Sequence, residues 1–299
     1  MKENQCLIIL FLLCSSIGFS QDRTIDSLLQ TRKTDSLAGK VKTFYSPGSK
    51  KIATELQQLV SDAVVYYENK YAIKFEIKMI VLDSTQWFKE IMSFGFVFYY
   101  GHWLVLNAGM DYNNFKKVYG FEAIAPQLDS AMKINGFTSE EIIYARLKFL
   151  SLHELGHYFV NTLSNAKSPN FWTNEFVAWY FANEYMSQFR PKLKKQFDLF
   201  CKTIANFYHP DYTSLKDFNE NYGKMKKGNF AWYHSRFYFL TDALYQCSGT
   251  SYLKKYEKNF PKNDSTELSA LQVSKLVEAD CNGIVTKWIE VTESNRKVH

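Results

Sequence analysis

The sequence has few cysteines and no long apolar run, and each of these features excludes certain classes of protein. Only five of the 299 residues are cysteine, and no two of them form a Cys-x-x-Cys pair. Thiolate zinc fingers and thioredoxin-like redox chemistry are therefore not expected. No segment reaches about 18 uninterrupted apolar residues, so no transmembrane helix is expected either.

Internal repeats, low-complexity segments and nucleic-acid recognition modules are also absent. The net charge of +6 comes from lysines scattered over predicted helices, a pattern typical of solvated helix faces. We therefore expect no nucleic-acid partner. With 46% hydrophobic residues the chain can fold as one large domain or two closely packed lobes.

The first 20 residues have the pattern of a secretory signal peptide. Lys2 precedes an apolar run from Leu7 to Leu13, and the small residues Gly18 and Ser20 come just before Gln21. Export to the periplasm or the extracellular space is the prediction. A buried N-terminal helix is one alternative, and a lipid anchor at Cys14 is another, which the large residue before that cysteine disfavours.

Cleavage would leave three cysteines, Cys201, Cys247 and Cys281. Export permits a disulfide, and the odd number leaves at least one thiol unpaired or paired outside the chain. Cys247 and Cys281 both lie in the C-terminal part and are the candidate pair.

The first half of the chain predicts a small mixed sheet with helices. Residues 21–49 are polar and predict a loose lead-in or a short helix. Apolar residues then recur at helical spacing over 52–64, residues 75–83 alternate like a strand, and residues 94–110 predict two short strands meeting near Gly101. This predicts an α/β lobe over 50–165 that ends in a long helix.

The second half, 166–299, predicts an all-helical lobe. Thr138 and Glu141 fit a capping box that starts the long helix. After Ser168 and Pro169 a second helix is expected over 170–189. Further helices are expected at about 192–207, 229–247, 250–259 and 266–292, the last with a break near Asp280.

The long helix contains HELGH, with His153 and His157 four residues apart. Such residues differ by about 40° around a helix, so both imidazoles can bind one metal ion. Glu154 lies about 100° from His153, where its carboxylate can take a proton from a bound water. The alternative is a pair of histidines on an ordinary buried or solvated face.

A catalytic zinc site needs a third protein ligand, and FWTNEFVAWYFA, residues 171–182, offers Glu175. At this point the chain resembles the gluzincin zinc peptidases, in which HExxH is completed by a glutamate on the next helix, often within W-x-N-E-x-x-A. The matching residues are His153, Glu154, His157, Trp172, Asn174, Glu175 and Ala178.

The resemblance implies a thermolysin-like, mostly helical α+β fold and one Zn²⁺ bound by His153, His157 and Glu175. It also implies that Glu154 is the general base and that a tyrosine on a later helix donates to the oxyanion. The best match is Tyr233, on a stripe with Phe237, Leu240 and Leu244. His234 is the alternative donor, and a purely structural role for the tyrosine is the other.

Two features differ from the family pattern. Trp179 stands where thermolysin-like members have an aspartate that orients the first histidine. The segment 101–110 has no glutamate to hold a free amine, which argues against a strict aminopeptidase. It can still offer an edge strand to an extended peptide.

Together these patterns predict an exported zinc metallopeptidase that acts on a peptide or protein substrate. Two alternatives stay open: a non-catalytic binding protein on a peptidase fold, and a zinc hydrolase of a non-peptide amide or ester.

Overall fold

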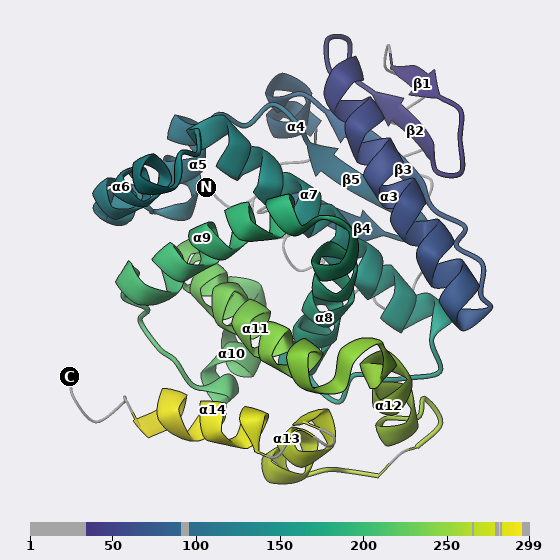
Figure 1. Ribbon diagram of the computed structural model, residues 1–299, viewed down its shortest axis with the longest axis vertical. Helices are drawn as coiled ribbons and strands as arrows, with labels where there is room; N and C mark the ends of the chain where they lie inside the picture. Colours follow the sequence, from purple (N-terminus) through teal and green to yellow (C-terminus); the bar gives the residue numbers. More distant parts are fainter. Residues whose placement is uncertain (1–33, 91–95, 265, 279–280, 282, 295–299) are drawn as a thin grey trace, which may run out of the picture.

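A computed structural model describes residues 34–90, 96–264, 266–278, 281 and 283–294. The expected signal peptide and Cys14 lie outside these ranges. The described part is mostly helical and contains one small mixed sheet, as the sequence predicts. The sheet precedes the helix that carries HELGH in the chain and lies toward one end of the molecule, whereas most of the later helices extend away from it (Figure 1).

The sheet has five strands in the order β1-β2-β3-β5-β4. Strands β2, β3 and β5 are parallel, whereas the outer strands β1 and β4 pair antiparallel with their neighbours. The predicted strand at 75–83 is confirmed, and so is the strand pair that turns at Gly101, whose φ is 54°. The strands are β1 (Asp35–Leu37), β2 (Lys42–Tyr45), β3 (Lys78–Leu82), β4 (Val97–Tyr100) and β5 (Trp103–Asn107).

Two expectations for this region are wrong. Residues 34–49, expected as a loose lead-in or a short helix, contain β1 and β2. Their pairing with β3 is a long-range contact that local composition does not reveal. The segment 101–110 supplies β5, which is enclosed between β3 and β4, so the edge strand is β4 instead.

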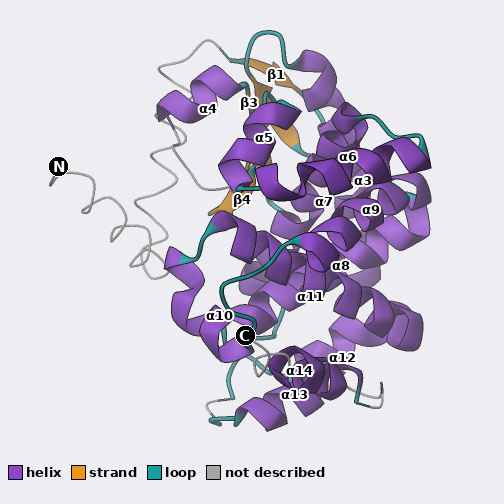
Figure 2. Ribbon diagram, turned by 90° about the vertical axis from the view of Figure 1, so that its left-hand side faces the viewer, coloured by secondary structure: helices purple, strands orange, loops and turns teal. Residues whose placement is uncertain are grey.

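The two faces of the sheet are covered differently. Helix α3 (Lys50–Tyr71), the helix predicted around 52–64, crosses one face and buries its apolar side there (Figure 1). Helix α4 (Ser84–Glu90) lies by the opposite face (Figure 2), where Trp87 joins a small separate cluster with Ile80, Leu82, Trp103 and Val105.

After the sheet come α5 (Tyr112–Tyr119), the 3₁₀ turn η2 (Glu122–Ile124) and α6 (Ala125–Asn135), which the sequence reading did not predict. Helix α7 (Ser139–Tyr158) then begins with the predicted capping box between Thr138 and Glu141. HELGH occupies the last turns of α7, which ends at Tyr158. A π-helical turn, η3 (Phe159–Leu163), follows immediately. Helix α7 packs under β4 and against α8.

From α8 (Phe171–Phe189) onward the described residues form helices and turns, apart from an isolated bridge between Ala166 and Pro261. Asn170 caps α8 through Thr173, so the cap lies just after the expected Ser168–Pro169 start. The remaining elements are α9 (Pro191–Phe207), α10 (Leu215–Asn221), η4 (Tyr222–Lys224), α11 (Lys227–Ser248), η5 (Gly249–Ser251), α12 (Tyr252–Asn259), α13 (Ala270–Glu278) and α14 (Ile284–Ser294).

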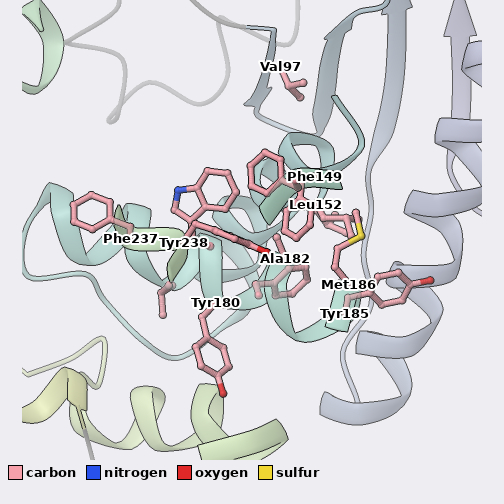
Figure 3. Close-up of a cluster of buried hydrophobic side chains, with 14 of the residues drawn as sticks. Val97, Phe149, Leu152, Tyr180, Ala182, Tyr185, Met186, Phe237 and Tyr238 are labelled. Carbon is pink, nitrogen blue, oxygen red and sulfur yellow. The ribbon is translucent and has the colours of Figure 1, made fainter. Parts of the chain in front are cut away.

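One hydrophobic cluster runs through both halves of the molecule. Its centre includes Phe149 and Leu152 of α7, Ala182 and Met186 of α8, and Tyr238 of α11 (Figure 3). The sheet and the helices therefore share a core. A buried ion pair between Lys70 of α3 and Glu184 of α8 further ties the two halves together.

The predicted disulfide between Cys247 and Cys281 is confirmed, and Cys201 is a buried free thiol. The bond joins the end of α11 to the segment between α13 and α14. Among the described residues no helix is both long enough and apolar enough to cross a membrane.

Candidate metal centre

Helices α7 and α8 bring His153, His157 and Glu175 together. The Nε2 atoms of the two histidines are 3.1 Å apart, and Glu175 Oε2 is 3.0 Å from His153 Nε2 and 3.2 Å from His157 Nε2. All three side chains are buried, with at most 6% of any residue exposed. Within the described ranges this is the one group of three such residues that could hold a metal ion.

The three donor atoms suit an ion the size of zinc. A triangle with sides of 3.0, 3.1 and 3.2 Å has its corners about 1.8 Å from its centre. Donor atoms this close together can all be reached by one ion at the distance of about 2.0–2.1 Å that zinc takes with nitrogen and oxygen ligands. Two imidazoles and one carboxylate also form a ligand set that zinc accepts in catalytic sites.

Close contact between the two helices makes this convergence possible. A Cβ atom added at Gly156, inside HELGH, would lie 2.9 Å from the Cα and the carbonyl oxygen of Ala178. Real Cβ atoms essentially never approach backbone so closely, so a larger side chain here would push α8 away. Ala178, whose backbone meets Gly156, stands one turn after Glu175, so this contact sets the distance of Glu175 from α7.

Tyr222 fixes the orientation of the Glu175 carboxylate. Its hydroxyl donates a short hydrogen bond to Oε1, which leaves Oε2 facing both histidines. Tyr222 lies in η4, directly after α10, and stacks on Phe171 at a centroid distance of 4.5 Å. Tyr222 is not among the predicted site residues, because α10 was not predicted either. Ser214 followed by Asp217 is nevertheless a helix-start signal.

Burial and charge divide the protons of the group unevenly. Burial lowers the pKa of His153 to about 4. Burial alone would also lower the pKa of His157, but the carboxylates of Glu175 and Glu154 outweigh it and raise that pKa to about 9. Burial likewise opposes ionisation of Glu175, yet the charge on His157 holds the Glu175 pKa well below its ordinary value. These shifts favour a protonated His157 beside an ionised Glu175.

Glu154 lies beside the triad of His153, His157 and Glu175 and faces the sheet. Its Oε2 accepts the backbone N–H of Tyr99 in β4, at 3.0 Å. Desolvation raises the pKa of Glu154 to about 7, against the opposing charge of His157. A carboxylate with such a pKa can both take up and release a proton near neutral pH.

Of the two predicted oxyanion donors, His234 reaches the triad and Tyr233 is engaged elsewhere. The Tyr233 hydroxyl is buried and donates to the carbonyl oxygen of Ser214 at 2.8 Å. His234 Nε2 lies 3.5 Å from Glu175 Oε2. The expected stripe of Tyr233 with Phe237, Leu240 and Leu244 is buried, as predicted.

Trp179 sets the tautomer of His234. Its indole Nε1–H donates to His234 Nδ1 at 3.1 Å. Burial lowers the pKa of His234 to about 3, so the ring is neutral and its one proton must be on Nε2, directed at the triad. This Nε2 atom is buried and has no hydrogen-bond acceptor among the described residues.

Trp179, four residues after Glu175, gives His153 no hydrogen-bond acceptor. Its ring packs 4.3 Å from the His153 ring and cannot accept a proton from it. His153 Nδ1 is buried without a hydrogen-bond partner in the described part of the chain. On the Nδ1 side, His153 is therefore positioned by packing rather than by a hydrogen bond.

Comparisons with known proteins add no relative to this picture. No protein-family model matches the chain, and a search of curated proteins finds no significant match.

Proposed function

We propose that this protein is an exported zinc-dependent metallopeptidase with a gluzincin-like fold. The observation that carries the proposal is the convergence of His153, His157 and Glu175 from neighbouring helices, with the Glu154 carboxylate alongside. The family resemblance in sequence involves the same residues. The disulfide between Cys247 and Cys281 supports export, because such bonds persist in oxidising compartments.

His153, His157 and Glu175 would hold the zinc ion, and Tyr222 would keep Glu175 Oε2 directed at it. When bound, zinc supplies a Lewis acid that lowers the pKa of a coordinated water and polarises a carbonyl. Glu154 then takes a proton from the attacking water and delivers it to the leaving nitrogen. Desolvation raises the pKa of Glu154, which favours uptake of that proton.

His234 is the donor that we assign to the developing oxyanion. Its Nε2–H is buried, directed at the triad and fixed by Trp179. A donor aligned in advance needs no reorganisation when charge develops. This assignment replaces Tyr233, whose hydroxyl is bound to Ser214.

Strand β4 offers a place for the substrate backbone. Phe96 accepts from Asn107 N at 2.7 Å, so the alternate residues Val97 and Tyr99 direct their backbone groups away from β5. Tyr99 N meets Glu154 on that side. An extended peptide pairing with this edge would pass over the triad.

The test is a digest of a proteome-derived peptide mixture by the purified mature protein, with and without chelator, combined with metal analysis. We expect about one zinc per chain and cleavage that chelator abolishes. His157→Ala should lose both, whereas the exposed His209→Ala should keep both. Full zinc retention in His157→Ala would eliminate the ligand assignment.

The digest tests the first alternative, and a peptide-like inhibitor tests the second. Bound zinc without cleavage of any peptide would favour a non-catalytic binding protein. Failure of a phosphinic peptide mimic to inhibit or bind would favour a hydrolase of non-peptide amides or esters.

A further inference from the structure

Arg146 is a buried cation that the mechanism above does not use. It lies on α7, is 7% exposed, and its Nη1 has no hydrogen-bond acceptor among the described residues. Its guanidinium carbon lies 4.5–5.6 Å from the centroids of four rings, those of Phe96, Phe115, Tyr119 and Phe200. No described acidic side chain forms an ion pair with it.

The aromatic rings explain only part of this arrangement. Cation–π contacts attract the positive charge to the ring faces. They do not supply acceptors for the five N–H groups that lie in the plane of the guanidinium. A buried charge with unpaired donors is costly unless an anion completes it. The missing partner is thus a planar acceptor such as a carboxylate, which a guanidinium binds in a bidentate manner.

Arg146 is aligned with the metal centre along α7. Seven residues separate it from His153, so the two differ by about 20° around the helix and lie about 10 Å apart along its axis. Strand β4 follows the same path. Phe96, just before β4, covers Arg146, whereas Tyr99 meets Glu154 and stacks near His157. From Phe96 to Tyr99 the strand also covers about 10 Å.

We propose that Arg146 binds a carboxylate of the substrate about three residues from the bond that is cut. This rests on the proposed peptidase function and on a peptide extended along β4. The carboxylate has two sources, the free C-terminus of a short peptide or an Asp or Glu side chain in a longer one. The first would make the enzyme release short C-terminal fragments, and the second would place cuts at a fixed distance from acidic residues.

The test uses a set of matched peptides that carry Glu or Gln at one position and a free or amidated C-terminus. Their binding to the full chain is measured calorimetrically in excess chelator, where no cleavage occurs. We expect one carboxylate to strengthen binding about 10-fold to 100-fold. If amidation weakens binding, the terminal carboxylate is the ligand of Arg146. If Gln in place of Glu weakens binding, the side-chain carboxylate is the ligand.

Arg146→Met should abolish this preference, and Arg146→Lys should retain part of it because the charge remains without the bidentate geometry. Arg190→Met is the control, because Arg190 pairs with Asp62 at the surface. If Arg146→Met does not fold, the lysine variant alone decides. Equal binding of neutral and acidic peptides by the wild type, or an unchanged preference in a folded Arg146 variant, would overturn the proposal.

The two proposals fail separately. Chelator-sensitive cleavage with no dependence on any carboxylate would leave the peptidase standing and remove the role of Arg146. An Arg146-dependent binding preference without cleavage would keep the carboxylate site and remove both the peptidase and the stated distance to a cut.

Discussion

The triad comes from α7 and α8, whereas Tyr222 and His234, which contact it, come from η4 and α11. The positions of the triad residues follow from helical spacing and from one close helix contact at Gly156. The positions of Tyr222 and His234 depend on how the short helix η4 and the distant helix α11 pack against α8. The comparison teaches that the candidate metal ligands are specified locally, while the residues that contact them are specified by the tertiary fold.

Among the residues of α7 and α8, the largest effect is expected from Glu154→Gln, beside the triad. The amide cannot accept the proton of the attacking water, so the rate should fall about 10³-fold to 10⁴-fold while zinc remains bound. Peptide cleavage and metal content measured on one preparation check this. Glu140→Gln, an exposed change at the start of the same helix, is the control. Undiminished cleavage by Glu154→Gln would remove Glu154 as base.

Of the residues that contact the triad from η4 and α11, His234 is tested first. We expect His234→Ala to lower kcat about 10²-fold to 10³-fold without loss of zinc. Tyr233→Phe loses one hydrogen bond to Ser214, so it should cost about 1 kcal/mol of stability and change the rate little. Steady-state kinetics and thermal unfolding of both variants decide between the two donors. The opposite ranking of the rates would restore Tyr233.

A smaller effect is expected from Tyr222→Phe. Without the hydroxyl, Glu175 Oε1 loses its hydrogen bond and the carboxylate can rotate. Zinc affinity should fall about 10-fold to 100-fold, measured by competition with a chelating dye. Tyr245→Phe on α11 serves as the control. Unchanged affinity would show that packing alone orients the carboxylate.

Per pH unit, the smallest expected effect is the pH dependence of zinc binding. With a pKa of about 9, metal-free His157 carries a proton at neutral pH that zinc must displace. The affinity should therefore fall about tenfold for each pH unit between pH 9 and pH 7. Calorimetry in two buffers of different ionisation enthalpy should report close to one proton released. Release of none at pH 7.5 would contradict the charge assignment.

The parts of the fold that follow from local rules were predictable. The helical period gave α3, alternation gave β3, and the capping box placed the start of α7. HELGH and Asn174–Glu175 identified the three residues that the structure brings together. The disulfide was also anticipated, from the shared C-terminal position of its cysteines.

The rest depends on contacts between residues far apart in sequence. Strand β2 owes its conformation to pairing with β3, and β4 is the edge because β5 inserts between it and β3. The different surroundings of Tyr233 and His234 have the same origin. Both lie on α11, and only the packing of Trp179 and Ser214 around them decides which one faces the metal centre.

The contact between Gly156 and Ala178 also bears on how this protein can evolve. A methyl group at position 156 would collide with the α8 backbone, so the two helices would separate and Glu175 would withdraw from the histidines. We expect lineages that descend from a common ancestor with this chain to retain the smallest side chains at both positions wherever the histidines persist. Once the histidines are lost, bulkier residues should accumulate at both sites.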